Sequence, residues 1–216
     1  MKICGITNAD DALLACELGA DAIGFIFYEK SPRCVTKEQA AAIAAQLPEQ
    51  VAKVGVFVAS PPDDIRRHIE AVGLTAAQFH GDYALDTMAQ FSQEMVIAVA
   101  RVGADFQARS VAQFQEVAAA VLLDTQKRGM YGGTGETFDW QAAIAAKAHA
   151  RIILAGGLTP ENARNAAEIV APYALDISSG VEASPGKKDH AKLRRLFEQL
   201  RGCGKKQPQG QGFLRD

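Results

Sequence analysis

The chain has 216 residues, a length that suits one domain and is slightly short for a barrel of eight strand–helix units. Hydrophobic residues make up 48% of it and charged residues 22%, which is ordinary for a protein with a full core. The net charge of −2 gives no reason to expect nucleic acid or an anionic membrane as a partner, so any anion site must be local.

The cysteines and the apolar runs indicate in which cellular compartment the protein is expected. Cys4, Cys16, Cys34 and Cys203 show neither the spacing of metal ligands nor a disulfide-rich pattern. No apolar run reaches the length that spans a membrane, and the first residues lack the charged and apolar regions of a signal peptide. We therefore expect a cytoplasmic protein.

Short apolar runs rich in β-forming residues alternate with longer helical stretches from end to end. Eight runs recur about every 25 residues, which is the length of one strand–helix unit. The predicted strands are Lys2–Cys4, Ala22–Phe27, Lys53–Val58, Ala76–His80, Val96–Arg101, Ala120–Asp124, Arg151–Ala155 and Ala174–Ser178.

This pattern predicts one α/β domain over residues 1–201, a (β/α)8 or TIM barrel with its active site at the C-terminal rim of the strands. A doubly wound sheet is the alternative architecture, but evenly spaced units without a domain break favour the barrel. Residues 202–216 are rich in Gly, Lys and Gln, so we expect a flexible C-terminal tail.

Residues with capping chemistry mark the expected helix starts. Thr36 followed by Gln39 resembles a capping box. Ser60-Pro61 and Thr159-Pro160 each place a hydroxyl cap before a proline that fits the first turn of a helix.

Two potential proton-transfer groups end predicted strands that lie far apart in the chain. Cys4 ends the first strand and Asp124 the sixth, and in a parallel barrel the ends of all strands share one rim. An ionised thiol acts as a base, and a carboxyl whose pKa is raised by burial or by nearby negative charge acts as an acid. The alternative reading is structural, because a lone cysteine in a strand is usually a small buried hydrophobe and an aspartate there often caps a loop.

Glycines and serines follow the last two predicted strands. Gly156 and Gly157 come after the seventh, and Ser178, Ser179 and Gly180 follow the eighth, where barrels often bind phosphate with loop amides and a helix N-terminus. Tight turns also favour these residue types, but two such loops at the two expected strands favour a phosphate site. With the two proton-transfer groups, this arrangement suggests an isomerase that acts on a sugar phosphate.

Further polar residues and one long loop belong to the same rim. His80 ends the fourth predicted strand and Asp176 lies in the eighth; each either orients substrate hydroxyls or a catalytic partner, or serves as a structural hydrogen-bonding residue. The segment Gln126–Thr137 is a long loop in the position of a lid, although it is equally compatible with a loop that has no such role. We expect no cofactor and no metal, because the chain lacks GxxxxGK[ST], a strand-to-helix GxGxxG and a His/Cys/carboxylate cluster.

A set of motifs runs in order and at barrel spacing from Met1 to about Leu200. It comprises Lys2-Ile3-Cys4-Gly5-Ile6-Thr7, Gly24–Phe27 with Ser31-Pro32-Arg33, Gln78-Phe79-His80-Gly81, Leu122-Leu123-Asp124-Thr125, Gly132-Gly133-Thr134-Gly135, Ala155-Gly156-Gly157-Leu158, Asp176-Ile177-Ser178-Ser179-Gly180-Val181-Glu182 and Pro185-Gly186-Lys187-Lys188-Asp189. The set resembles that of the phosphoribosylanthranilate isomerases of tryptophan biosynthesis. Each motif alone is modestly specific, and together they are very specific.

The resemblance implies a cofactor-free Amadori rearrangement of N-(5′-phosphoribosyl)anthranilate. It implies Cys4 as the general base, Asp124 as the general acid and Arg33 as the residue that binds the anthranilate carboxylate, which a planar guanidinium matches in a bidentate way. The small phosphorylated substrate is the expected partner, and both a monomer and a homodimer stay open.

Two other functions remain as alternatives. The related isomerases of the histidine pathway are expected to use paired aspartates and phosphate sites in both halves, whereas Cys4 stands at the first position here and no glycine-rich phosphate loop follows the fourth or fifth strand. A non-catalytic barrel that binds a phosphorylated metabolite would keep the phosphate loops but would not need Cys4 and Asp124 together.

Overall fold

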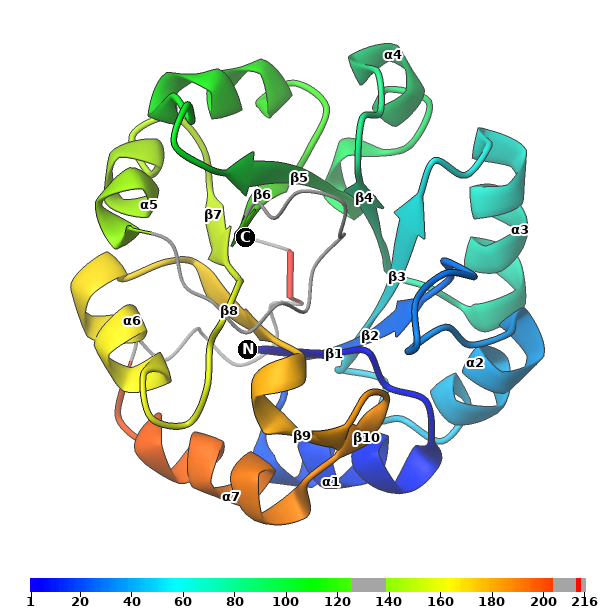
Figure 1. The fold of residues 1–216 in the computed structure, drawn as a ribbon. Helices are drawn as coiled ribbons and strands as arrows, with labels where there is room; N and C mark the ends of the chain where they lie inside the picture. The colour runs from blue at the N-terminus through cyan, green and yellow to red at the C-terminus, as the bar shows by residue number, and fades with distance from the viewer. Residues whose placement is uncertain (126–138, 204–212, 215–216) are drawn as a thin grey trace.

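A computed structural model describes residues 1–125, 139–203 and 213–214 of the chain. Eight parallel strands form a closed barrel in the order of the sequence (Figure 1). They are β1 (Lys2–Cys4), β2 (Ala22–Ile26), β3 (Ala52–Val58), β4 (Ala76–His80), β5 (Val96–Val102), β6 (Ala120–Thr125), β7 (Ile152–Leu154) and β8 (Ala174–Ile177). The predicted barrel is confirmed, and every predicted strand is present with ends shifted by no more than one residue.

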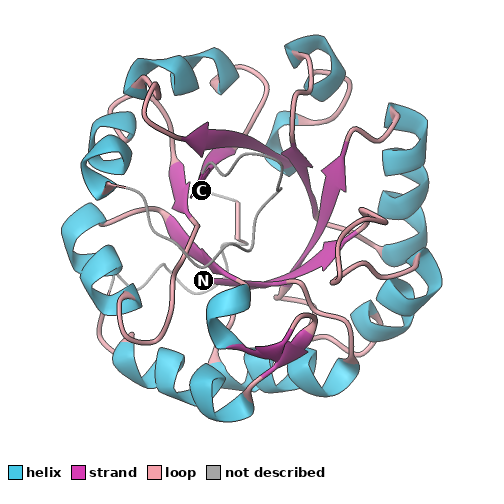
Figure 2. Ribbon diagram, viewed as in Figure 1, coloured by secondary structure: helices cyan, strands magenta, loops and turns pink. Residues whose placement is uncertain are grey.

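Helices surround the barrel on its outside (Figure 2). The α-helices are α1 (Ala9–Leu18), α2 (Lys37–Ala44), α3 (Pro62–Val72), α4 (Leu85–Met88), α5 (Trp140–Ala146), α6 (Ala163–Val170) and α7 (His190–Gln199). The described residues also form three 3-10 helices, η1 (Gln93–Met95), η2 (Ala108–Phe114) and η3 (Ser179–Val181), and a hairpin of β9 (Glu182–Ser184) and β10 (Lys187–Lys188). Among the described residues, no helix has the length and apolar character that a membrane span requires.

The helix starts follow the sequence signals only in part. The capping box of α2 is confirmed, since Thr36 accepts from the N–H of Gln39 and the Gln39 side chain accepts from the N–H of Thr36. The predicted cap at Ser60 is wrong, because Pro61 is the N-cap residue of α3 and no side chain caps it. Thr159 accepts from the N–H of Glu161 in a turn that precedes α6, so it does not cap the helix itself.

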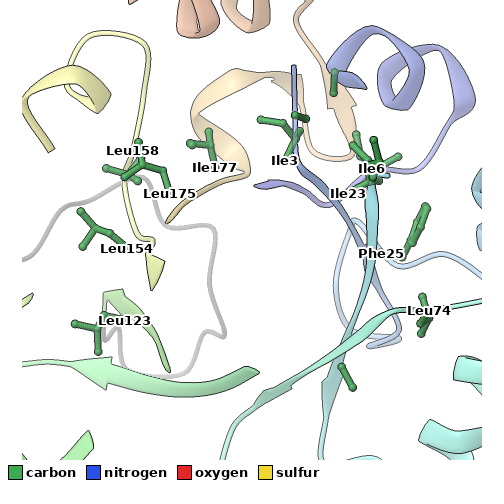
Figure 3. Packing of buried hydrophobic residues seen from close by; sticks show 14 of the residues in the cluster. Ile3, Ile6, Ile23, Phe25, Leu74, Leu123, Leu154, Leu158, Leu175 and Ile177 are labelled. Carbon is green, nitrogen blue, oxygen red and sulfur yellow. The ribbon is translucent and has the colours of Figure 1, made fainter. Parts of the chain in front are cut away.

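Alternation along each strand separates two sets of side chains. The outward set packs against the helices and forms the main hydrophobic core; Figure 3 shows Ile3, Ile23, Phe25, Leu123, Leu154, Leu175 and Ile177 among its members. Apart from Lys2 at the start of β1, the inward set is apolar at the N-terminal ends of the strands, and most of its other polar members lie toward their C-terminal ends. This division places the polar groups at one mouth of the barrel.

The apolar inner layer is built largely from small side chains. Ala22, Ala52, Ala76, Ala120 and Ala174 each stand at the first position of their strand.

Phe213 and Leu214 pack on this alanine layer and are 6% and 8% exposed. The hydroxyl of Tyr173 donates to the carbonyl oxygen of Phe213 at 2.8 Å. In Figure 1 the red segment at residues 213–214 accordingly lies within the ring of strands. Residues 204–212, 215 and 216 of the expected flexible tail lie outside the described residues.

Candidate active site

The C-terminal ends of the strands surround one pocket with an empty volume of about 760 Å³, open solvent at its mouth included. Nine of the ten predicted site residues line it: Cys4, Arg33, His80, Asp124, Gly156, Gly157, Asp176, Ser178 and Ser179. Apolar side chains, Ile26, Val56, Val58, Leu122 and Leu158, line the rest together with Tyr28, Ser31, Gln78 and Ala155. The predicted proton-transfer groups thus share a single cavity.

Gly180 is the predicted site residue that does not line the pocket. A Cβ at this position would lie 1.9 Å from the carbonyl oxygen of Leu158. Because Gly180 has no side chain, the loop after β8 lies directly against the loop after β7, and these are the two loops predicted to bind phosphate.

Cys4 is 5% exposed and sits at the inner face of β1. Burial raises the pKa of the Cys4 thiol above its ordinary range, and the negative charge of Asp176 adds to this shift, while Lys2 and more weakly Lys188 oppose it. The surroundings of Cys4 therefore favour the neutral thiol, whereas the predicted base is the ionised form.

Gly24 on β2 makes room for the thiol. It pairs with Cys4 across the parallel ladder, and a Cβ on Gly24 would lie 2.7 Å from Sγ of Cys4. A larger residue at this position would displace the sulfur, because real Cβ atoms do not approach so closely.

Asp124 ends the inner face of β6 and is 7% exposed. Its Oδ1 accepts a hydrogen bond of 2.9 Å from the N–H of Thr125. Burial raises the pKa of Asp124 to about 6, with a further contribution from Asp176, while the Thr125 N–H and the cations Arg101 and Lys2 oppose it. At neutral pH an appreciable fraction of this carboxyl is still protonated, as a general acid requires.

His80 approaches Asp124 from β4, with 4.0 Å between its Nε2 and Oδ2 of Asp124. Burial lowers the pKa of His80 to about 4, and the positive charges of Arg101 and Lys2 add to this shift. The imidazole is therefore neutral near pH 7 and does not supply a cation to Asp124.

Asp176 on β8 connects the pocket to a buried lysine. Its Oδ2 accepts from Nζ of Lys2 at 2.9 Å, and Nζ also donates to Oε1 of Gln78 at 2.9 Å. The Oδ1 atom of Asp176 is buried and has no hydrogen-bond partner within the described part of the chain. Since Asp176 lines the pocket, this oxygen is available to a donor on a bound molecule.

Arg33 lies at the mouth and is held by the hairpin after β8. Its guanidinium donates to both carboxylate oxygens of Glu182, from Nε at 2.8 and 3.1 Å and from Nη2 at 2.7 Å. Burial opposes ionisation of Glu182, but Arg33 and Lys188 outweigh it and lower the pKa of this carboxyl. Glu182 therefore orients Arg33 as a charged partner would, and both side chains are largely buried.

Gly156 brings the loop after β7 close to the carboxyl of Asp124. It has a φ of 83°, and a Cβ here would lie 2.4 Å from Oγ1 of Thr125 and 3.1 Å from Oδ1 of Asp124. Both the backbone conformation and the contact therefore require glycine.

Sequence reasoning missed several charged or polar residues that the barrel brings to this site: Lys2, Gln78, Arg101, Glu182 and Lys188. Lys2, Gln78 and Arg101 each lie an even number of residues from another inward-facing residue of the same strand: Cys4 on β1, His80 on β4 and Val99 on β5. The period of two along a strand is the signal that would have found them.

Two further expectations concern what the site holds and what covers it. Within residues 1–125, 139–203 and 213–214, no group of three His, Cys, Asp or Glu side chains forms a metal site. The expected lid, Gln126–Thr137, lies outside the described residues.

Comparison with known proteins identifies a family whose members the chain matches along most of its length. The chain matches the family model of N-(5′-phosphoribosyl)anthranilate (PRA) isomerase over residues 1–199. The N-(5′-phosphoribosyl)anthranilate isomerase of Citrifermentans bemidjiense is 46% identical over 201 residues, which cover 93% of this chain and 96% of that protein. The enzyme of the same name from Thermotoga maritima is 42% identical over 204 residues, with 94% and 98% covered.

Solved structures agree with the sequence relatives. A crystal structure of phosphoribosyl anthranilate isomerase from T. maritima has a TM-score of 0.86 at 41% identity and covers 93% of this chain and 98% of that chain. A phosphoribosyl anthranilate isomerase in complex with reduced 1-(o-carboxyphenylamino)-1-deoxyribulose 5-phosphate has a TM-score of 0.83 at 39% identity, with 93% and 97% covered. Because sequence and fold match along almost the whole chain, the protein belongs to the N-(5′-phosphoribosyl)anthranilate isomerase family of tryptophan biosynthesis.

Proposed function

We propose that Asp124 and Cys4 carry out the isomerase reaction of this family as general acid and general base. The reaction converts N-(5′-phosphoribosyl)anthranilate to 1-(2-carboxyphenylamino)-1-deoxyribulose 5-phosphate. The observation that carries the proposal is that a thiol and a carboxyl from strands β1 and β6 line one pocket with the two loops suited to phosphate.

Asp124 acts first, on the ring oxygen of the ribose. It donates its proton to this oxygen, the bond between C1′ and the oxygen breaks, and the nitrogen lone pair forms an iminium at C1′. A pKa of about 6 suits this step, because it lies close enough to neutral pH for a fraction of the carboxyl to carry the proton that it donates. The substrate's own phosphate and carboxylate add negative charge and favour the protonated acid further.

Cys4 then removes the proton from C2′. The electron pair of that C–H bond forms the C1′–C2′ double bond of an enolamine, and the iminium nitrogen becomes neutral. The enolamine tautomerises to the aminoketone when C1′ gains a proton and the C2′ hydroxyl loses one. The iminium acidifies the C2′ proton, so a thiolate is a sufficiently strong base.

The remaining predicted residues bind the substrate. We assign the anthranilate carboxylate to Arg33, whose orientation is set by Glu182, and the phosphate to the backbone of the loops with Gly156-Gly157 and Ser178–Gly180. Asp176 and His80 orient the ribose hydroxyls, and the free Oδ1 of Asp176 supports this role.

The test is turnover of N-(5′-phosphoribosyl)anthranilate, followed by loss of its fluorescence, in wild type, Cys4→Ser and Asp124→Asn. Each substitution should lower kcat by about 100-fold or more, the usual contribution of one acid or base. Cys16→Ser, a half-buried cysteine outside the pocket, is the matched control and should be fully active. Full activity in both pocket variants would end the acid–base assignment.

Location and assembly belong to the same proposal. The four cysteines, Cys4, Cys16, Cys34 and Cys203, are free thiols, which supports a reducing cytoplasm. A solved T. maritima relative consists of monomers generated from a dimeric enzyme, so relatives exist in both forms. The present chain is proposed to be a monomer or a homodimer, which its mass in solution would decide.

A further inference from the structure

Two lysine side chains are buried beside the proposed base. Lys2 lies on β1 two residues before Cys4 and is not exposed at all, and Lys188 comes from β10 and is 2% exposed. An ammonium group in such a place needs charged or hydrogen-bonding partners. The two lysines differ in the partners that they have.

Lys188 donates hydrogen bonds to two backbone carbonyls and to the hairpin of β9 and β10. Its Nζ donates to the carbonyl oxygens of Cys4 at 2.7 Å and Ser178 at 3.1 Å, and to Oε1 of Glu182 at 3.1 Å. Burial lowers the pKa of Lys188, although Glu182 acts in the opposite direction. This lysine thus ties the loop after β8 to the end of β1.

Lys2 is anchored inside the barrel and stays charged. Its Nζ donates to Asp176 and to Gln78, each at 2.9 Å. Burial acts against the ammonium, but Asp176 and Cys4 outweigh burial and raise the pKa of Lys2. The interior of the barrel therefore holds a positive charge in a fixed position.

The stem of Lys2 passes beside the thiol. A Cβ on Gly24 would lie 2.7 Å from Sγ of Cys4 and 3.0 Å from Cε of Lys2, so both side chains occupy the space next to this glycine. A cation held beside the sulfur stabilises the thiolate form of Cys4 and has little effect on the neutral thiol.

We propose that Lys2 is a positioning residue whose buried ammonium, fixed by Asp176 and Gln78, is the counter-charge against which the thiolate of Cys4 forms during isomerisation. The role rests on the proposed function of Cys4 as the base. Lys2 acts through Cys4, since its own side chain does not line the pocket.

The other charges at the site determine what loss of Lys2 should do. Lys2 is the strongest charge that lowers the pKa of Cys4; Asp176 raises this pKa, and Lys188 lowers it less than Lys2. Around Asp124, Asp176 raises the pKa, and Arg101 lowers it together with Lys2, which is the weakest of the three. Removal of the Lys2 charge should therefore raise the pKa of Cys4 strongly and that of Asp124 slightly.

The first readout is the pH dependence of Cys4 alkylation by iodoacetamide, in a background in which Cys16, Cys34 and Cys203 are replaced by serine. Lys2→Met removes the charge and keeps the length of the side chain. Lys2→Gln removes the charge but keeps a donor for Asp176, so it should fold even if the methionine variant does not. At about pH 7.5 we expect Cys4 in either variant to react about tenfold more slowly than in the parent.

Lys53→Met is the matched control, because Lys53 lies on the outer side of β3 and outside the pocket. It should leave the alkylation profile unchanged. A folded Lys2→Gln or Lys2→Met protein whose Cys4 reacts like that of the parent would overturn the proposal.

The second readout is the pH profile of kcat/KM. Loss of Lys2 should move the alkaline limb to higher pH and lower kcat/KM about tenfold at neutral pH, while KM changes less than about threefold. A purely structural lysine would lower activity without moving the limb, and that result would also contradict the proposal. If Cys4→Ser is fully active, the proposed base fails, yet the alkylation comparison still decides whether Lys2 controls the thiol.

Discussion

In the free protein, the proton lies on the proposed base, Cys4, more than on the proposed acid, Asp124. The pKa of Asp124 is about 6, and burial raises the pKa of Cys4 above its ordinary range. Between the two values, most molecules carry the proton on Cys4 and not on Asp124. The reactive form, with a protonated Asp124 and an ionised Cys4, contains the same number of protons, so activity should persist across this range at a constant reactive fraction.

Burial of the Asp124 carboxylate should lower the free energy of unfolding, in addition to the proposed role of Asp124 as the acid. Its folded-state pKa of about 6 lies above the ordinary value, so folding loses stability as pH rises to about 6, and the full penalty is present above that pH. Asp124→Asn removes the penalty and should raise the free energy of unfolding at about pH 8 by about 1–3 kcal/mol.

Urea unfolding at several pH values measures this effect. The advantage of Asp124→Asn should shrink as pH falls toward about 4, where the wild-type carboxyl is protonated in both states. Asp105→Asn, at an exposed position, is the control and should change stability little at any pH. An asparagine variant that is less stable than wild type at high pH would show that the Asp124 carboxylate stabilises the fold.

At the scale of elements, strand β2 makes room for Cys4 and Lys2 because Gly24 has no side chain. Gly24→Ala would place a Cβ against Sγ of Cys4 and Cε of Lys2. We expect kcat/KM to fall about 100-fold, because a displacement of a catalytic group by about 1 Å has effects of this size.

Gly55→Ala is a matched control for this substitution. Gly55 lies on β3, and its added Cβ would meet Leu74 and Phe57 in the core outside the barrel. This variant should lower the melting temperature and keep its kcat/KM, because overpacking there does not reach the pocket. Equal losses of kcat/KM in both glycine variants would mean that Gly24 acts only through stability.

The loop after β2 should govern binding more than chemistry. Arg33→Ala removes a guanidinium whose expected ligand is remote from the reacting bonds, so KM should rise about 10- to 100-fold while kcat changes little. Steady-state kinetics with Arg66→Ala as an exposed control measures this. A collapse of kcat with an unchanged KM would contradict the assignment of Arg33.

Across the whole molecule, the barrel interior has an apolar end and a polar end. At the apolar end, Phe213 and Leu214 fill space that the alanine layer leaves. Phe213→Ala should lower the free energy of unfolding by about 3 kcal/mol, the usual loss for a buried phenylalanine, and leave kcat/KM unchanged because the active site lies at the other mouth.

Chemical unfolding and kinetics of the same preparation test this separation. Ile169→Ala, at a side chain that is 52% exposed, is the control and should change stability by less than about 0.5 kcal/mol. A Phe213→Ala protein as stable as wild type would show that the C-terminal residues contribute nothing to the barrel.

The sequence predicts the barrel and its rim well because the repeat of short apolar runs and helical stretches is visible locally along the chain. Cys4 and Asp124 end their strands, and that alone places them at one rim. Lys2, Gln78 and the burial of Phe213 depend on contacts between distant segments. The period of two indicates that Lys2 and Gln78 point inward, but their hydrogen bond to each other and the burial of Phe213 follow only when the eight strands close into a barrel.

The proposal that Cys4 and Asp124 act together as base and acid is tested most directly by the pH dependence of kcat/KM in wild type and Asp124→Asn. The wild-type profile should fall below about pH 6, stay level through neutral pH and fall again in the alkaline range where Cys4 ionises. Without the acid, the residual activity of Asp124→Asn should have no limb near pH 6 and should increase with pH until Cys4 is ionised. An Asp124→Asn profile of the same shape as the wild-type profile would contradict the account.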